Sequence, residues 1–579
     1  MGWKQIKAKV DAITARFSRS RRADSTAFKD LLNLVELLTN KLEKANLRIE
    51  FLEGELEGKK RGKSSSNTGR RESSKHGKNS RSKPSDHSSE KHRKGMEADD
   101  SAKGTARKPG PGRNSKADLE IHNIQLCTID PSLLPADARY KGTRTTVIRD
   151  MRIVQWNTQF ELEVYYSASE GKSYVAPLPE GYDKGEFGPG LKGAIVTMKY
   201  DAGTSETGIE RFLNGYGVPI SAGSISNILL KMGENFGDER TEIVGAGFRS
   251  TVYGQSDDTS AKVKGKSWHT HVLCNEYYTA YFTREGKDRM TLIDVFLGRD
   301  AANRSYRYSE LTDEFLCLLG VSKRQAGRLD AAAKKGKDYD QKGMDALLGE
   351  LFIEEGKDGS PKKTIGGLIA EAMALTYYHE QEDVIIPEVL ISDDAPQYQL
   401  LALDHMLCWI HDGRHYEKLS PLVGRHRLEL EKFREKYWSY YKELAKYRVA
   451  PGKKAARRLE KKFGRLFRTK TGYQELDERI AKTLAKKERL LVVLRRPEVP
   501  LHNNASELGA RRAARRRDIS LHSRSLKGVE SMDTLTTIVE TCRKLKVEAG
   551  NYIRNRLEGL VSHGERLPAL IRKASAANA

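Results

Sequence analysis

Three acidic residues lie far apart in the sequence, and each has neighbours that would present its carboxylate to a shared site. Asp257 follows the run 251–256, Asp393 follows the hydrophobic run 384–392, and Glu507 follows two asparagines, Asn503 and Asn504, that are expected to cap the start of a helix. Carboxylate oxygens are the ligands that Mg²⁺ prefers, and two such ions can hold the attacking and leaving oxygens of a phosphodiester displacement. The three acids therefore predict a site for two Mg²⁺ ions, with Mn²⁺ as a substitute.

The first two acids are expected at strand ends and the third on a helix. After residue 250 the pattern predicts strands at 251–257, 267–275 and 277–283, a helix, a strand ending at Asp393, a helix, a short strand at 407–411, and the helix of Glu507. Residues 300–380 and 420–495 read as helical insertions, and the second is rich in basic side chains. Long insertions leave Glu507 near the sheet provided that their ends return close together.

The segments around the three acids carry a family resemblance. Residues 256–274 (SDDTSAKVKGKSWHTHVLC), residues 392–398 with 408–419 (SDDAPQY and CWIHDGRHYEKL), and residues 501–517 (LHNNASELGARRAARRR) resemble the three catalytic blocks of the IS66-type insertion-sequence transposases. The matching positions are Asp257, Thr259, Gly265, Lys266 and Trp268, then Asp393, Tyr398, Cys408, Trp409, His411 and Arg414, then Asn503, Asn504 and Glu507.

The resemblance implies an α/β fold with a ribonuclease H-like catalytic core, a mixed sheet flanked by helices. It also implies Mg²⁺-dependent cleavage and transfer of DNA strands by a DDE transposase, with Asp257, Asp393 and Glu507 as metal ligands. The chain departs from the family pattern at Asp258, Asp394, His502 and Leu508. Because neighbouring side chains on a strand point to opposite faces, only one aspartate of each doubled pair can enter the site, and the motif register favours Asp257 and Asp393.

Other polar residues of these blocks are candidate DNA contacts. Cys408 and Trp409 are expected in the core of a strand, with His411 and Arg414 at its exposed end, touching DNA or supporting the metal site. No zinc is expected, because no second Cys/His pair lies near Cys408 and His411 in the sequence. The candidate DNA contacts on either side of the third acid are Asn503, Asn504, Arg511 and Arg512. A plain Glu507–Arg511 ion pair along one helix face is the alternative interpretation of this glutamate.

The composition favours a nucleic-acid partner. The 579 residues include 102 Lys and Arg against 79 Asp and Glu, giving a net charge of +23, with a pI near 9.5. Such an excess binds polyanions by releasing counterions, which predicts double-stranded DNA, both element ends and target, as the partner. Five scattered cysteines read as free thiols, and the absence of a long apolar run predicts a cytoplasmic, nucleoid-associated protein that does not bind membranes.

The amino-terminal part predicts self-association. A seam at Leu31, Val35, Leu38, Leu42, Ala45, Ile49, Leu52 and Leu56 follows a heptad pattern. We expect a coiled coil that makes the chain a homo-oligomer, most simply a dimer through residues 31–56; a helix packed on its own chain is the alternative. Residues 58–118 are basic and nearly free of large apolar side chains, which predicts a disordered linker that holds DNA through phosphates.

Two further segments precede the acids. Residues 119–200 contain strand-like runs at 144–148, 160–166 and 173–177, at the position where related chains carry a zinc ribbon; only Cys127 remains here, so packing alone must hold the segment. Residues 205–232 predict a helix-turn-helix, with Ser221 capping the second helix. Ser224, Ser226, Asn227 and Lys231 of that helix are then expected to reach DNA.

These features divide the chain into eight parts. The expected boundaries are a coiled coil at 1–57, a linker at 58–118, a β-containing region at 119–200, a helix-turn-helix at 201–248, a catalytic core at 249–419, a basic insertion at 420–495, the rest of the core at 496–548, and a tail at 549–579. The predicted function is that of a transposase, which accessory proteins could assist. A transposase-derived DNA-binding protein without activity, and a ribonuclease H-like nuclease that cannot join strands, are the alternatives.

Overall fold

The structure is a computed structural model, and it describes most of the chain. The described residues are 29–39, 41, 42, 45, 48, 49, 52, 120–135, 137–151, 153–182, 185–351, 365–382 and 386–577. The predicted linker at 58–118 and the last residue of the leucine seam, Leu56, lie outside them.

A five-stranded mixed sheet forms the centre of the fold. Its strands are β3 (Tyr253–Val263), β4 (Lys266–Cys274), β5 (Thr279–Arg284), β8 (Val389–Ser392) and β9 (Asp404–Leu407). Their order is β5-β4-β3-β8-β9. Strands β3, β4 and β5 follow one another in sequence and pair antiparallel. Strand β8 pairs parallel with β3 on one side and with β9 on the other. The predicted strands at 267–275 and 277–283 are confirmed within a few residues at each end, and so is the strand that ends before Asp393. The strand expected at 251–257 also forms, but it continues to Val263 because its pairing with β4 extends that far, so Asp257 lies inside β3 and not at the expected strand end.

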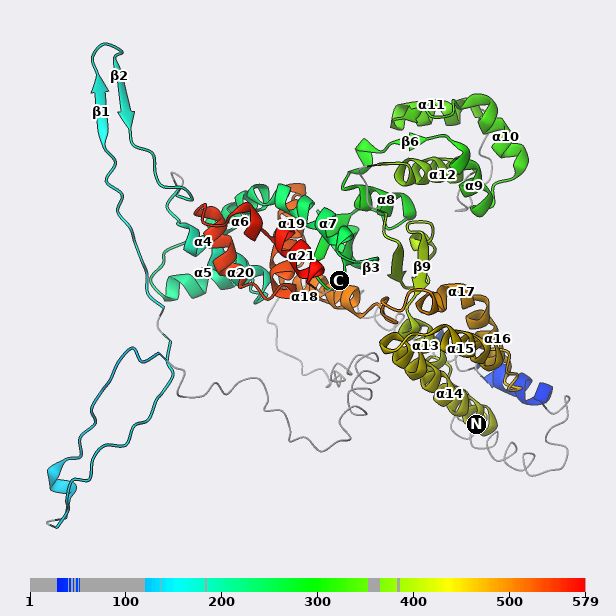
Figure 1. Ribbon diagram of the computed structural model, residues 1–579, viewed down its shortest axis with the longest axis horizontal. Coiled ribbons are helices and arrows are strands. Elements are labelled where there is room, and N and C mark those ends of the chain that lie inside the picture. The colour runs from blue at the N-terminus through cyan, green and yellow to red at the C-terminus, as the bar shows by residue number, and fades with distance from the viewer. Residues whose placement is uncertain are drawn as a thin grey trace, which may run out of the picture.

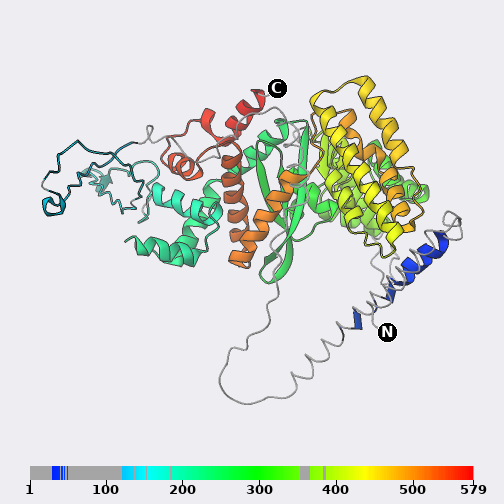
Figure 2. The same ribbon diagram turned by 90° about the horizontal axis from the view of Figure 1, so that it is seen from below.

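Helices from both ends of the described chain surround this sheet (Figure 1). The helices that precede it are α4 (Pro189–Tyr200), α5 (Glu206–Gly215), α6 (Ala222–Asn235) and α7 (Gly237–Arg249). Those that follow Glu507 in sequence or contain it are α18 (Asn504–Ser520), α19 (Leu526–Lys544), α20 (Ala549–Leu557) and α21 (Leu567–Ala576). Figure 2 shows α18 and α19 lying beside the central sheet. Hydrogen bonds tie α19 to β5, because the buried Asp533 accepts from Thr283 N.

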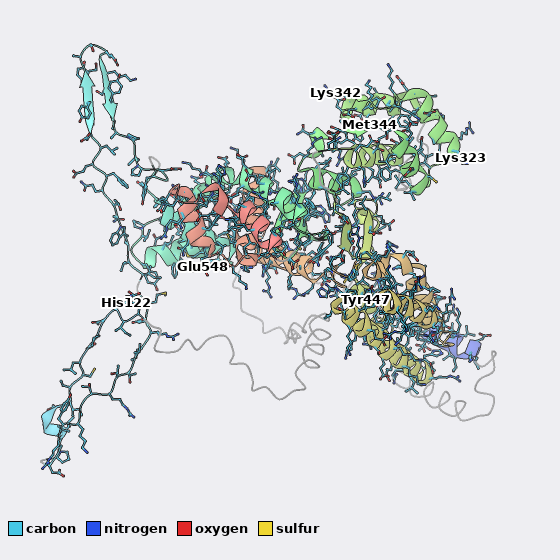
Figure 3. The ribbon with its side chains drawn as sticks, in the orientation of Figure 1. His122, Lys323, Lys342, Met344, Tyr447 and Glu548 are labelled. Atoms are coloured by element: carbon cyan, nitrogen blue, oxygen red, sulfur yellow. The ribbon has the colours of Figure 1, made fainter. Side chains whose placement is uncertain are left out.

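The insertion expected at 300–380 forms a separate helical lobe. After α8 (Arg289–Leu297) it contains α9 (Glu310–Leu318), α10 (Lys323–Ala332), α11 (Gln341–Leu351), α12 (Ile365–His379) and a small sheet of β6 (Tyr306–Arg307) and β7 (Asp338–Tyr339). Figure 3 labels Lys323, Lys342 and Met344 in this lobe. Met344 is buried, and α12 is buried along most of its length, so this insertion is less polar inside than its sequence indicates.

The second insertion packs directly on the sheet. It consists of α14 (Gly424–Val449), α15 (Lys453–Leu466), α16 (Gln474–Ala485) and α17 (Lys487–Leu490), preceded by α13 (Trp409–Glu417). Trp409 is fully buried, and its indole N–H donates to Leu490 O at 2.9 Å. The backbone N–H of Trp409 donates to Leu501 O at 3.0 Å, so the two ends of the insertion lie together, as the placement of Glu507 requires.

Two local predictions between the second and third acids are wrong. The segment between β8 and β9 is only a 3₁₀ turn, Pro396–Tyr398, and not a helix. The short strand expected at 407–411 ends at Leu407, and Trp409 begins α13, so His411 and Arg414 lie on a helix. The run of buried side chains from 406 to 410 crosses from strand to helix, and such a short apolar run cannot distinguish the two.

The amino-terminal helix docks on the second insertion. Residues 29–39 are helical, and the carboxylate of the buried Glu36 accepts hydrogen bonds from the backbone N–H groups of Leu422 and Val423, just before α14. Asn33 accepts from Gln474 N at 2.9 Å, at the start of α16. One face of this helix therefore packs within its own chain, which was the alternative interpretation.

The predicted leucine seam lies mainly on the other face of this helix. Among the described seam residues, Leu31, Leu38, Leu42, Ile49 and Leu52 are exposed, by 40–52%. The dimeric coiled coil stays a prediction, because a single chain cannot show it.

Residues 120–176 differ most from expectation. The segment forms one hairpin, β1 (Val164–Ser167) with β2 (Lys172–Val175), and no strand at 144–148. Both strands are almost wholly exposed, and the large apolar side chains of Ile124 and Trp156 are 89% and 87% exposed. Packing against the described part of the chain therefore does not hold this segment, contrary to the prediction. Figure 3 labels His122 on its extended part.

Candidate active site

The pairing of β3 with β4 places Asp257 and Asp258 on opposite faces of the sheet. Asp257 lies opposite Val272, and Asp258 lies opposite His271. Directly opposed residues share a face of the sheet. Val272 packs with Ala510 of α18, so Asp257 faces that helix. Asp258 points to the other face, where its carboxylate lies 3.6 Å from His269 Nδ1 and 3.5 Å from the hydroxyl of Tyr398.

In the second pair of aspartates, Asp394 forms ion pairs that direct its carboxylate toward the second insertion. Asp394 pairs with Lys486 at 2.5 Å and with Arg489 at 3.1 Å, both from the second insertion. β3 and β8 are parallel with Gln255 level with Ile391, and this register continued by two residues brings Asp393 level with Asp257. Adjacent strands lie about 4.8 Å apart, so the two carboxylates occupy neighbouring positions.

Helix α18 brings Glu507 to the same face because a glycine lets it approach the sheet closely. A Cβ at Gly509 would lie 2.8 Å from Val272 Cγ1, which is closer than side-chain atoms tolerate. Tyr281 of β5 donates its hydroxyl to Gly509 O at 3.3 Å. The three acids are therefore brought together from β3, β8 and α18.

Asn503 fixes the start of this helix. Its side-chain amide donates to Ser256 O at 2.7 Å, immediately before Asp257, and its backbone N–H donates to Cys408 Sγ at 3.3 Å. Asn503 stands at the N-cap position, but its side chain makes no capping hydrogen bond. The expected cap is thus replaced by a tie between α18 and β3.

Glu507 is held by α13. Its side chain is 9% exposed; one carboxylate oxygen pairs with Arg414 Nη2 at 3.1 Å, and the other lies 3.5 Å from His411 Nδ1. Of the two roles expected for His411 and Arg414, this placement favours support of the site over direct contact with DNA. These partners come from about 90 positions upstream, whereas the alternative interpretation paired Glu507 with Arg511.

Asp257 is perturbed by its burial and by the neighbouring carboxylates. Burial raises the pKa of Asp257 to about 7, and the charges of Glu507, Asp258 and Asp393 add to this, against a hydrogen bond from Asp258 N that lowers it. Burial likewise lowers the pKa of His411, although Glu507 and Asp393 oppose the shift. The site is therefore a partly buried cluster of acids whose negative charges repel.

Such a cluster suits a hard divalent cation. Mg²⁺ and Mn²⁺ select carboxylate oxygens, and a bound cation would relieve the repulsion that raises the pKa of Asp257. The donor set of Asp257, Asp393 and Glu507 fits that requirement, and the part each acid plays as a ligand stays a prediction.

The basic residues of α18 divide into two groups. Arg511 is exposed. Arg512 pairs with Glu540 of α19, whose side chain is 1% exposed, and Arg516 reaches the same carboxylate at 3.2 Å. A direct DNA contact by Arg512 is not supported by this placement, nor is one by the fully buried Asn503. Asn504 is also buried, at 8% exposed.

The predicted helix-turn-helix residues lie away from the acids. Helices α5 and α6 occupy the expected positions, and Ser221 caps α6 by accepting from Ser224 N at 3.1 Å. The Ser224 hydroxyl hydrogen-bonds with Ser221 Oγ, whereas Asn227 and Lys231 are exposed. Their contact with DNA stays a prediction.

Sequence reasoning missed Gly509 and the hydrogen bond that Cys408 accepts from Asn503. Gly509 had a signal, because glycine inside a helix is unfavourable and this one lies two positions after Glu507. The packing role of Cys408 as the acceptor for Asn503 had none.

Comparisons with known proteins give the following. A model described as the IS66 family of transposases matches residues 378–531, which include Asp393 and Glu507. A protein of Sinorhizobium fredii (strain NBRC 101917 / NGR234), described as uncharacterized protein y4jO, is 30% identical over 315 residues, or 54% of this chain and 94% of that relative. Within the described residues, no helix combines the length and apolarity needed to cross a membrane.

Proposed function

Because this chain belongs to the IS66 family of transposases, we propose that it cuts and joins DNA strands at the ends of a bacterial-type insertion sequence. The observation that carries the proposal is the convergence of Asp257, Asp393 and Glu507 from β3, β8 and α18 on one face of the sheet. Together they supply the carboxylates that a DDE mechanism needs.

The strand order supports a ribonuclease H-like core. In such cores the first two acids come from adjacent central strands and the third from a flanking helix. Strands β3 and β8 are adjacent and parallel within the order β5-β4-β3-β8-β9. Helix α18 contacts this sheet through Gly509 and Ala510.

The carboxylates have distinct duties in the proposed reaction. Two Mg²⁺ ions held by these acids would activate the attacking oxygen, first of water and then of a DNA 3′-hydroxyl, and stabilise the leaving oxygen. Asp257 and Asp393 supply neighbouring oxygens from adjacent strands, and Glu507 completes the set from the helix side. Arg414 holds the Glu507 carboxylate, His411 lies beside it, and Asn503 holds the helix that carries it.

Glu507→Gln tests this proposal. We expect the full chain, supplied with Mg²⁺ and DNA spanning the borders of its own coding region, to nick and join strands, and EDTA to stop both. Glu507→Gln should bind the same DNA within about twofold but lose cleavage by about 10²-fold or more, since catalytic electrostatic contacts are worth that much. Glu478→Gln, an exposed glutamate on α16, is the matched control and should keep full cleavage.

The other outcomes distinguish the alternatives. Nicked DNA without joined products would identify a ribonuclease H-like nuclease. Binding with no cleavage by the wild-type chain would identify a DNA-binding protein derived from a transposase. Equal cleavage by wild type and Glu507→Gln would refute the assignment of this acid.

A further inference from the structure

A second set of metal-binding atoms lies against the third acid. Cys408 Sγ, a ring nitrogen of His411 and a carboxylate oxygen of Glu507 all lie within 4.8 Å of one another. In sequence, Cys408 and His411 have no second Cys/His pair near them. The fold supplies the third donor from 96 positions downstream of His411.

Three local features create this cluster. Cys408 is the N-cap residue of α13 and His411 lies in its first turn, so three residues of spacing put both side chains on one side of the helix. Glu507 lies in the first turn of α18. The backbone N–H of Asn503 donates to Cys408 Sγ, which fixes the start of α18 beside the start of α13.

We propose that Cys408, His411 and Glu507 form a binding site for Zn²⁺ that shares Glu507 with the all-carboxylate Mg²⁺ site. Sulfur, imidazole and carboxylate together are donors for zinc, whereas Mg²⁺ takes oxygen alone. Three protein ligands leave a fourth tetrahedral position open, as in zinc sites that exchange a ligand. His411 Nδ1 is buried and has no hydrogen-bond partner among the described residues, so it is available as a ligand.

The surroundings permit this binding with small movements. Zinc–ligand bonds of about 2.0–2.3 Å place ligand atoms less than about 4 Å apart, so the three donors must close slightly. Arg414 pairs with one oxygen of Glu507, while the other faces His411, so the carboxylate can serve both partners. The Cys408 thiol must release one proton to solvent when zinc binds.

A zinc ion here would regulate the proposed reaction. Glu507 belongs to both sets of donors, so zinc bound at Cys408 and His411 would draw this carboxylate from the Mg²⁺ site and inhibit strand cleavage. This consequence rests on the proposed function, whereas zinc binding itself does not.

The binding test uses Co²⁺ as a spectroscopic substitute for Zn²⁺ on the full chain without Mg²⁺. We expect one tightly bound ion per chain, a tetrahedral cobalt spectrum with a thiolate charge-transfer band, and its displacement by Zn²⁺. Cys408→Ser should remove the thiolate band, and His411→Gln should weaken binding by about tenfold or more. Cys317→Ser, which alters an exposed cysteine, is the matched control and should keep the band.

Two results would overturn the zinc site. One is a wild-type chain that gives no thiolate band, and the other is a band that survives in Cys408→Ser. The first result is measured on the wild-type chain, so it overturns the proposal even if Cys408→Ser does not fold.

The activity test separates this inference from the proposed function. Micromolar Zn²⁺ should inhibit Mg²⁺-dependent nicking by the wild-type chain, and Asp257→Asn should bind Co²⁺ normally although it does not nick. A thiolate band in a chain that never nicks would support the zinc site and refute the transposase activity. Nicking by a chain without the band would do the opposite.

Discussion

Replacing Asp257 by asparagine should stabilise the metal-free protein at alkaline pH. Burial and the charges of Glu507, Asp258 and Asp393 raise the pKa of Asp257 from 3.8 to about 7. Since each pKa unit corresponds to about 1.4 kcal/mol, the ionised Asp257 destabilises the fold by up to about 4 kcal/mol. Asparagine keeps the shape of the side chain and removes the charge.

The effect must depend on pH in one direction. A carboxyl group whose pKa is higher in the folded state binds its proton more tightly there, so its stability contribution is complete below 3.8. That contribution is lost as the pH rises through about 7. Asp257→Asn should therefore match the wild type near pH 4 and exceed it by about 2–4 kcal/mol at pH 8.

Hydrogen exchange of peptides from β3 and β8 measures this locally, in a chain whose several lobes need not unfold together. The measurement is made in EDTA at pH 4 and pH 8, with Asp518→Asn as control, because Asp518 is an exposed aspartate on α18. In a separate measurement with Mg²⁺ in place of EDTA, protection should rise in the wild type and stay nearly unchanged in Asp257→Asn. Two results would refute the reasoning. One is a variant whose β3 and β8 peptides are no more protected than those of the wild type at pH 8, and the other is a gain in protection that is the same at both pH values.

Three further predictions concern the elements around the site. Gly509→Ala should push α18 from the sheet, cost about 1–3 kcal/mol of stability and lower cleavage; Val272→Ala should restore both in the double variant by making room, and failure of that rescue in thermal and cleavage assays would count against the close approach. Glu36→Gln should weaken docking of helix 29–39, seen as faster proteolysis of that helix by about tenfold, since hydrogen bonds to a charged group contribute about 1.5–3 kcal/mol. Arg511→Ala should reduce the salt dependence of DNA binding by about one charge, while Arg512→Ala, whose guanidinium pairs within the protein, should not; equal slopes would contradict this division.

The sequence predicted most of what local pattern controls. Strand alternation was enough to predict that Asp257 and Asp258 face opposite sides of the sheet, as their pairing with Val272 and His271 shows, whereas the preference for Asp257 came from the motif register. The helix of Glu507 was also predictable, although the expected side-chain cap does not form. The ligand roles of these acids stay predictions.

The contacts that could not be predicted from the sequence are made with residues far away along the chain. Arg512 reads as a DNA contact until the fold places the buried Glu540 of α19 against it. Asn503 reads as a helix cap until its amide meets Ser256 of β3. The run from 406 to 410 contains too few residues for its periodicity to distinguish a strand from a helix. The strand predicted at 407–411 therefore includes the first three residues of α13.

The measurement that tests the central claim most directly compares two neighbouring aspartates in Mg²⁺-dependent strand cleavage. Asp393→Asn should bind DNA normally and lose cleavage by about 10²-fold or more, because it removes a proposed metal ligand. Asp394→Asn should keep cleavage within severalfold, because that carboxylate pairs with Lys486 and Arg489. Undiminished cleavage by Asp393→Asn, or loss confined to Asp394→Asn, would contradict the proposed site.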